Sequence, residues 1–550
     1  MTIKNRTFIV AVCWSVIASV QLLNAQNKQA FEVSKNFNIL HTLYGELNQF
    51  YVDSVKPEVA LGRAIEGLMS AYDPYTNYIA EAETDELKFI TTGEYGGVGA
   101  IIGQRNGKVL VFEPYHGLPA QKSGLQYGDE LLEIGGVKMV GSDMNKASDL
   151  LRGGPGTTVE IVYMRPGFKK PVKKVITREL IQMNQVTWFG LVGEKVGYIN
   201  LNSFTTKSTQ EVRNALIQLK SMGAESLILD LRGNGGGLLD EAVSICNLFV
   251  PKGQEIVRTK GRISQSDRIY KTIQQPVDTL MPLVVLVNSG SASSSEIVAG
   301  ALQDLDRAVI LGNRTFGKGL VQTTRSISYN GVLKITTAKY YIPSGRCIQA
   351  IDYSNRNEDG SVGRIPDSLT HVFKTRSGRP VRDGGGIIPD IKCMDQLTSQ
   401  LAMDLMDSLY IFEYANRYFQ KHEKISAVSE FKLQESDLQD FLAFIQSKNF
   451  KYENRSFKML EKLKQLIKED GMLDQTASEI QLLESKLSAG LEADFKAGIS
   501  EIELLLVSEI VSRYYFQSGK LQASLKYDPC VQKAIDLFKD GNRLKVILNF

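Results

Sequence analysis

The chain has 550 residues, of which 43% are hydrophobic and 23% are charged. This composition is typical of a globular protein with several domains, each large enough for its own core. Lysine and arginine number 64 against 61 aspartates and glutamates, so the net charge is only +3. A nucleic-acid binder carries a larger basic excess, and we therefore expect no nucleic-acid partner.

The N-terminus has the pattern of an export signal. Lys4 and Arg6 precede an apolar run over residues 8–23, and Asn24-Ala25-Gln26 offers small residues for cleavage. We expect a signal peptide at residues 1–25 and an exported, periplasmic protein. An uncleaved membrane anchor is the alternative, although the apolar run is short for a membrane span.

Cysteines and histidines are too scattered to suggest a metal site. The five cysteines show no CxxC spacing, and the four histidines stand outside any HExxH context. We expect neither a metal nor a cofactor. Buried free thiols are the favoured state, although the four cysteines after Cys13 could pair in an oxidising compartment.

Four further regions follow one another along the chain. The patterns predict a helical segment, then a small β-rich module with glycine turns, then an α/β core with a buried sheet, and finally a separate helical domain rich in Lys and Glu. In the same order, these regions cover residues 27–90, 91–170, 175–395 and 396–550.

The β-rich module contains two glycine-rich stretches. In GGVGAIIG (96–103), successive backbone amides could hold a carboxylate. The later stretch GLPAQKSGLQYGDELLEIGG (117–136) resembles the signature of PDZ domains. Such domains bind C-terminal peptides by adding a strand to a sheet edge. The resemblance assigns the terminal carboxylate of the peptide to the amides of Val98, Gly99 and Ala100.

The stretch VNSGSASSSEIVAG (287–300) raises the question of a nucleophile. A serine hydroxyl needs a base to remove its proton, and His371 lies in a polar segment with no other mark of function. Lys318, between two glycines, could serve instead if burial lowered its pKa towards neutrality. Gln322 could then orient the neutral amine, and activity would rise with pH as the lysine loses its proton.

Several motifs resemble those of the carboxy-terminal processing proteases, also called tail-specific proteases. They are LILDLRGNGGG, SGSASSSEIVAGALQD, GNRTFGKGLVQ, YYIPSGRCIQ and GGGIIPDI, which follow the PDZ-like module. The resemblance implies a Clp-protease/crotonase-like α/β core and a Ser-Lys-Gln triad made of Ser293, Lys318 and Gln322. This chain has Ser294 where alanine is usual, so the serines beside Ser293 remain chemical alternatives to it as the nucleophile.

Oxyanion stabilisation is expected from two backbone segments. The helical pattern after Ser293 predicts a helix N-terminus, where free amides stabilise negative charge, and the amide of Ser294 would be one donor. The glycine run after LDLRGN would supply the other, from Gly236 or Gly237. The sequence leaves open which of these two glycines it is.

The sequence thus predicts a multidomain α/β protein with a PDZ domain inserted before the catalytic core. As a serine endopeptidase, it would recognise the free C-terminal tails of exported proteins and cleave them. A catalytically silent PDZ scaffold is the alternative, and a crotonase-type acyl-CoA enzyme would explain neither the PDZ module nor the signal. The C-terminal helical domain could mediate homodimerisation or adaptor binding.

Overall fold

A computed structural model describes residues 30–81, 84–141, 144–357, 361–394, 398–448, 450, 452, 455–487 and 491–549. The predicted signal peptide at 1–25 lies outside these residues. The chain divides into two compact units, the first ending at Tyr78 and the second beginning at Ile79. The first unit holds a helix over residues 30–50 and α2 (Pro57–Ser70), which starts with a proline where a helix tolerates one. No described helix is long and apolar enough to cross a membrane.

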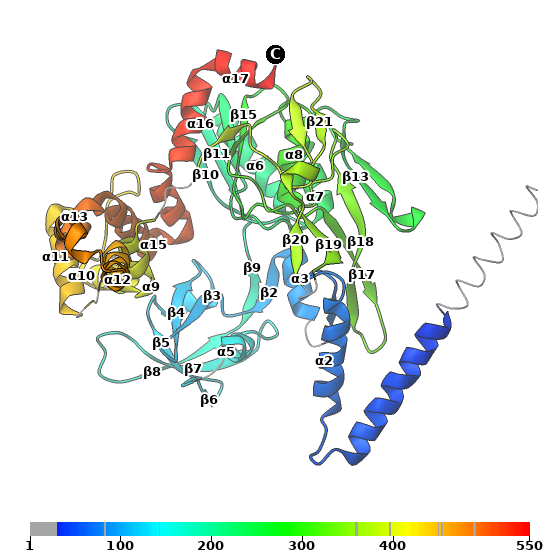
Figure 1. The fold of residues 1–550 in the computed structure, drawn as a ribbon, viewed down its shortest axis with the longest axis horizontal. Helices are drawn as coiled ribbons and strands as arrows, with labels where there is room; N and C mark the ends of the chain where they lie inside the picture. Colours follow the sequence, from blue (N-terminus) through cyan, green and yellow to red (C-terminus); the bar gives the residue numbers. More distant parts are fainter. Residues whose placement is uncertain are drawn as a thin grey trace, which may run out of the picture. The chain divides into compact units, whose positions relative to one another are not determined.

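The β-rich module is a sheet with strand order β3-β4-β5-β7-β8, in which β3 forms one edge. Helix α5 lies beside the sheet (Figure 1), and the short α4 contacts the last strand, β8, which lies entirely after residue 170. The ribbon of β2 and β9 connects the module with the core. The bounds are α3 (Thr84–Thr92), β2 (Glu94–Gly97), β3 (Ala100–Arg105), β4 (Lys108–Pro114), α4 (Pro119–Lys122), β5 (Glu130–Ile134), β6 (Val137–Lys138), α5 (Met144–Leu151), β7 (Thr158–Met164), β8 (Val172–Thr177) and β9 (Glu179–Gln182).

The core is built on a second sheet with strand order β10-β11-β12-β15-β16-β23. Only β10 runs antiparallel to its neighbour. Strands such as LVVLV of β15 are buried along their whole length, as in parallel sheets with both faces covered. The bounds are β10 (Val186–Val192), β11 (Val196–Leu201), β12 (Ser226–Asp230), β15 (Leu283–Val287), β16 (Val309–Gly312) and β23 (Ile391–Lys392).

The two faces of this sheet are covered by helices from distant parts of the chain. Alternate side chains of β12 and β15 pack with α6 (Ser208–Ser221), α7 (Leu239–Cys246) and α8 (Ser294–Asp304) on one face. On the other face they pack with α16 (Pro529–Lys539) and α17 (Gly541–Leu548), drawn in red in Figure 1. The last two helices therefore belong to the core.

A further sheet beside the core includes β13, β14, β17 and β18. Its long antiparallel pair, β17 and β18, directly follows the predicted lysine loop. The bounds here and in the following region are β13 (Glu255–Gly261), η2 (Ser264–Ser266), β14 (Arg268–Lys271), β17 (Leu320–Ser326), β18 (Val332–Tyr341), β19 (Ile351–Arg356), β20 (Val362–Arg364), η3 (Asp367–Leu369), β21 (Val372–Lys374) and β22 (Pro380–Arg382).

Among the remaining helices, those within residues 400–447 and 491–525 pack around a separate apolar cluster. A disulfide joins Cys393, after β23, to Cys530 in α16, whereas Cys246 and Cys347 are free thiols. The expectation of free thiols is therefore wrong for Cys393 and Cys530, because the packing of α16 on the sheet brings them together. The helix bounds are α9 (Gln400–Asp407), α10 (Tyr410–Lys421), α11 (Glu435–Ser447), α12 (Arg455–Glu469), α13 (Leu473–Leu487), α14 (Leu491–Ala497) and α15 (Ile499–Leu525).

Candidate catalytic site

The predicted site lies where three neighbouring parallel strands end. The glycine-rich loop follows β12, the serine cluster follows β15 and the lysine loop follows β16. In α/β sheets, functional groups gather at the carboxyl ends of the strands. Sheet order thus brings together three motifs that are far apart in the sequence.

The serine cluster contains one position that differs from its neighbours. The hydroxyls of Ser291, Ser294 and Ser295 donate to the carbonyl oxygens of Leu231, Gly237 and Asn234, respectively. All three serines are buried and tied to the glycine-rich loop. Ser293 is only half-buried and is the N-cap residue of α8. Its hydroxyl is therefore the one placed at both a helix N-terminus and an accessible surface.

The backbone of Ser293 is strained. Its φ of 55° and ψ of −115° lie in a region that residues with a side chain rarely adopt. Such conformations persist only where surrounding contacts enforce them, and they cluster at active sites. Here the N–H of Ser293 donates to Glu296 Oε2 at 2.9 Å, which fixes the turn into α8.

Glu296 connects the serine turn with the lysine loop. Its side chain is fully buried, and it accepts hydrogen bonds from the Thr315 hydroxyl and the backbone amides of Gly317 and Lys318. Burial raises the pKa of Glu296 to about 7, against the lowering effect of these hydrogen bonds. No sequence motif assigned a role to Glu296, although the Ser-x-x-Glu spacing of a capping box is visible in the sequence.

A tyrosine of β18 also contacts both the serine turn and the lysine loop. The Tyr340 hydroxyl lies 3.1 Å from the carbonyl oxygen of Ser293 and 2.5 Å from that of Lys318. Its ring is 1% exposed. The sequence analysis gave Tyr340 no role, because only the fold brings the end of β18 beneath the other two segments.

The third predicted triad member, Gln322, lies on β17 in the strand that follows the lysine loop. Its amide donates to the Thr336 hydroxyl on β18 at 3.1 Å, next to a bulge in the strand pair. Lys318 and Gln322 are half-buried. The structure thus places Ser293, Lys318 and Gln322 in adjoining segments at one end of the core.

The glycine-rich loop packs directly against the serine turn. A Cβ added at Gly236 would lie 2.8 Å from the Cβ of Ser293, and one at Gly237 would lie 2.2 Å from the carbonyl oxygen of Phe204. Both positions have positive φ, so only glycine fits comfortably. At these two positions the loop therefore needs residues without a side chain, so that its backbone can lie close to Ser293 and Phe204.

The two candidate oxyanion glycines differ in how their amides are used. The N–H of Gly236 donates to Asn234 Oδ1 at 2.9 Å. Among the described residues, no acceptor is recorded for the N–H of Gly237 or of Ser294. Asn234, which the sequence analysis missed, is fully buried, and its carbonyl oxygen also accepts the N–H of Ala292.

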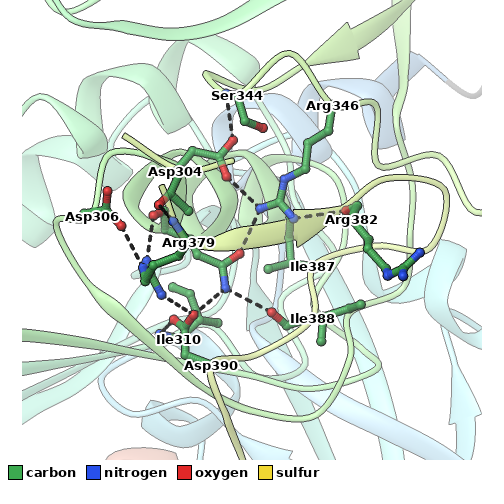
Figure 2. Close-up of polar contacts among 12 residues, drawn as sticks. Asp304, Asp306, Ile310, Ser344, Arg346, Arg379, Arg382, Ile387, Ile388 and Asp390 are labelled. Carbon is green, nitrogen blue, oxygen red and sulfur yellow. Dashed lines mark hydrogen bonds and ion pairs between the residues drawn. The ribbon is translucent and has the colours of Figure 1, made fainter. Parts of the chain in front are cut away.

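The far end of α8 is held by buried ion pairs. Arg346 lies 2.8 Å from Asp304 Oδ1, and both side chains are fully buried (Figure 2). The Arg346 guanidinium also donates to Gln303, while the N–H of Ser344 donates to Asp304. Arg379 pairs with Asp306 and Asp390 beside them (Figure 2). The helix that begins after Ser293 is thus anchored at its C-terminus.

The predicted peptide-binding amides line a small cavity in the PDZ-like module. The cavity has a volume of about 170 Å³. It is lined by Val98, Gly99 and Ala100, together with Ile102 of β3 and Leu151 of α5. Strand β3 is a free edge of the sheet, which is where a peptide can add as a further strand. The cavity and the edge therefore adjoin one another.

The rejected alternative base, His371, lies on the protein surface. Its imidazole is 80% exposed and lies 3.4 Å from Asp383. Among the described residues, no contact joins it to the serine turn. The structure therefore offers no support for a Ser-His-Asp triad.

A PDZ-like module beside an α/β core with an accessible serine at a strand-to-helix junction defines a PDZ-bearing serine peptidase. Models of protein families match the same regions: residues 195–354 match peptidase family S41, 113–165 a PDZ domain, and 401–538 the C-terminal helical domain of a probable PDZ-protease. The chain belongs to the family of carboxy-terminal-processing proteases.

Two curated relatives and one solved structure are similar to this chain. The carboxy-terminal-processing protease of Bartonella bacilliformis is 35% identical over 341 residues, which cover 61% of this chain and 77% of that protein. A probable CtpA-like serine protease of Staphylococcus aureus is 30% identical over 429 residues, covering 75% and 83%. The solved photosystem II D1 C-terminal processing protease is 29% identical, covers 64% of this chain and 85% of its own, and has a TM-score of 0.36.

Proposed function

We propose that this protease cleaves exported proteins whose free C-terminal tails bind its PDZ domain, with Ser293 as nucleophile and Lys318 as base. The observation that carries the proposal is the contrast within the serine cluster. Three hydroxyls are committed to backbone carbonyls, whereas Ser293 stands half-buried at the helix N-terminus next to the lysine loop. Family membership argues against a silent scaffold and against an acyl-CoA enzyme.

The proposed reaction proceeds through an acyl-enzyme. Neutral Lys318 takes the proton of Ser293 while the serine oxygen attacks the scissile carbonyl. The resulting oxyanion is stabilised by the amides of Gly237 and Ser294, since the Gly236 amide is engaged by Asn234. Lysine passes its proton to the leaving amine as the peptide bond breaks, and then activates water to release the acyl group. Gln322 orients the amine.

Substrate capture is assigned to the PDZ groove. The terminal carboxylate of the tail would bind the amides of Val98, Gly99 and Ala100, and the tail would pair with the free edge of β3. The apolar side chains of Ile102 and Leu151 at the cavity favour tails that end in an apolar residue. Export to the periplasm through the N-terminal signal, and homodimer or adaptor contacts through the helical domain, are further parts of the proposal.

Substitution of the two reacting residues tests the proposal. We expect Ser293→Ala and Lys318→Ala each to lower kcat on a protein with an apolar C-terminal tail by roughly a thousandfold or more. Binding of the tail peptide, measured by fluorescence anisotropy, should be unchanged. Ser289→Ala is the matched control, because Ser289 is an exposed member of the same cluster. Full activity of purified Ser293→Ala would refute the assignment.

The substrates can be identified by comparing cells. Mass spectrometry of intact exported proteins should find shortened C-termini in wild-type cells and full-length termini in cells that carry Ser293→Ala. The same measurement on the protease itself reports whether its mature N-terminus lies near Gln26. If the exported proteins keep identical termini in both strains, they are not substrates of this protease.

A further inference from the structure

Two buried side chains each contact both the nucleophile turn and the lysine loop. Glu296 comes from α8 and Tyr340 from β18, so neither lies in the loop that carries Lys318. Both are 0–1% exposed. The proposed roles of Ser293 and Lys318 leave these two residues without a function.

Glu296 joins the two segments through their amides. Its Oε2 accepts the N–H of Ser293 at 2.9 Å and the N–H of Lys318 at 2.8 Å. One oxygen atom therefore holds both backbone nitrogens, which fixes how far apart they can be. Its Oε1 accepts hydrogen bonds from the hydroxyl of Thr315 and the N–H of Gly317. The segment before the lysine is therefore bound to the same carboxylate.

Tyr340 joins the same two residues through their carbonyl groups. Its hydroxyl lies within hydrogen-bond distance of both carbonyl oxygens, and that of Lys318 is the closer acceptor. The backbone of Tyr340 also contacts the loop, because its N–H donates to the carbonyl oxygen of Gly319 at 3.0 Å. The amides and the carbonyls of both residues are thus held from different elements.

The two segments need such external support. Ser293 has a strained backbone, and Lys318 lies between two glycines, the residues with the greatest backbone freedom. A serine and its base react only when the two atoms are held in near-contact geometry, and a misplacement of about 1 Å can lower the rate about a hundredfold. Loop sequence alone provides no such precision.

We infer that Glu296 and Tyr340 are positioning residues that set the separation of Ser293 and Lys318. The inference rests on the proposed roles of those two residues. Glu296 acts on the amide side of both segments and Tyr340 on the carbonyl side. Neither touches the substrate, so both affect the reaction through the serine and the lysine.

Tyr340→Phe is the sharper test, because it removes one hydroxyl and keeps the buried ring. We expect kcat on a tailed substrate to fall about 10- to 100-fold, with KM and tail affinity unchanged. The rate at which a fluorophosphonate probe labels Ser293 should fall by the same factor, while urea unfolding should show that the variant is still folded under the assay conditions. Tyr341→Phe, the next residue along β18, is the matched control and should match wild type.

Glu296→Gln is the second variant that tests the inference. The new NH₂ group would face N–H donors, so at least one amide would lose its acceptor. We expect a loss of kcat and of probe labelling at least as large as in Tyr340→Phe. Wild-type kcat in Tyr340→Phe, or a loss no larger than the loss of folded protein, would overturn the inference. If Ser293→Ala kept full activity, the proposed function would fail instead.

Discussion

Glu296 is a buried carboxylate whose environment acts on it in two opposite ways. Removal from water favours its protonated form, whereas four hydrogen-bond donors favour the ionised form. Burial is the larger effect and raises the pKa to about 7 from its ordinary value of 4.5. The native state therefore binds a proton more tightly than the unfolded chain does.

This difference predicts how stability depends on pH. Because the native state holds the extra proton, the contribution of Glu296 to stability is full below pH 4.5 and is lost as pH rises to about 7. The loss is at most about 3 kcal/mol for a shift of this size. Urea unfolding at several pH values should show that wild type loses this stability relative to Glu296→Gln.

A surface control separates this effect from general titration. Glu225→Gln changes an exposed carboxylate that pairs with Lys195. Its stability curve should run parallel to that of wild type between pH 4.5 and 7, because an exposed pair contributes little. A wild-type curve parallel to that of Glu296→Gln would contradict the assigned pKa.

At the residue scale, sequence motifs indicate the proposed reacting groups better than the groups that hold them in place. Ser293 and Lys318 lie in motifs, and Glu296 has a visible capping spacing. Tyr340 and Asn234 carry no such signal, since each acts on segments that are distant in the chain. Which glycine amide is free likewise depends on a side-chain hydrogen bond that spacing does not reveal.

Helix α8 follows the proposed nucleophile Ser293, and all of its residues are buried. No face of the helix is exposed: its apolar side chains pack in the core, and polar contacts hold its two ends. The N-terminal end is held by Glu296 and the C-terminal end by Arg346 and Asp304. Burial raises the pKa of Asp304 and lowers that of Arg346, while their mutual attraction opposes both changes.

Breaking that ion pair should destabilise the core. Arg346→Ala leaves the buried charge of Asp304 without its partner, at a cost of about 3–5 kcal/mol. Urea unfolding measures this loss directly. Arg382→Ala is the control: its side chain is exposed and contacts Thr370, so the change should stay within about 0.5 kcal/mol. Equal stability of the two variants would contradict the structural role of the pair.

The strands of the core could be predicted because their apolar runs are unbroken. VGYINL, SLILDLRG, MPLVVLVNS and AVILGN correspond to β11, β12, β15 and β16, and the expected α/β core with a PDZ domain is confirmed. The order of the strands was not predictable from these runs. Pairing is decided by packing between elements rather than by local pattern.

At the scale of the whole molecule, one face of the catalytic core is covered by helices from a distant part of the sequence. A parallel sheet needs cover on both faces, and α16 and α17 supply the second cover. Asp528 caps α16 and also pairs with Arg232 in the glycine-rich loop at 2.6 Å. The sequence pattern of α16 and α17 resembles that of the preceding helices. The sequence therefore did not show that these two helices belong to the core rather than to the helical domain.

Because a disulfide links α16 to the core, the stability of the protein should depend on whether this bond is reduced. Cys393 and Cys530 are separated by 137 positions, and a cross-link over so long a loop stabilises by about 2–4 kcal/mol. Dithiothreitol should lower the free energy of unfolding of wild type by that amount. Cys530→Ala should respond no further to the reductant, whereas Cys347→Ala should respond like wild type, since Cys347 is free.

The same disulfide also determines what a single proteolytic cut would do. Other proteases that meet this protein can cleave it between residues 394 and 529 without separating the pieces, because Cys393 and Cys530 remain covalently joined. Helix α16 would stay on the sheet after such a nick. Damage to the helical domain therefore need not release the cover of the catalytic core.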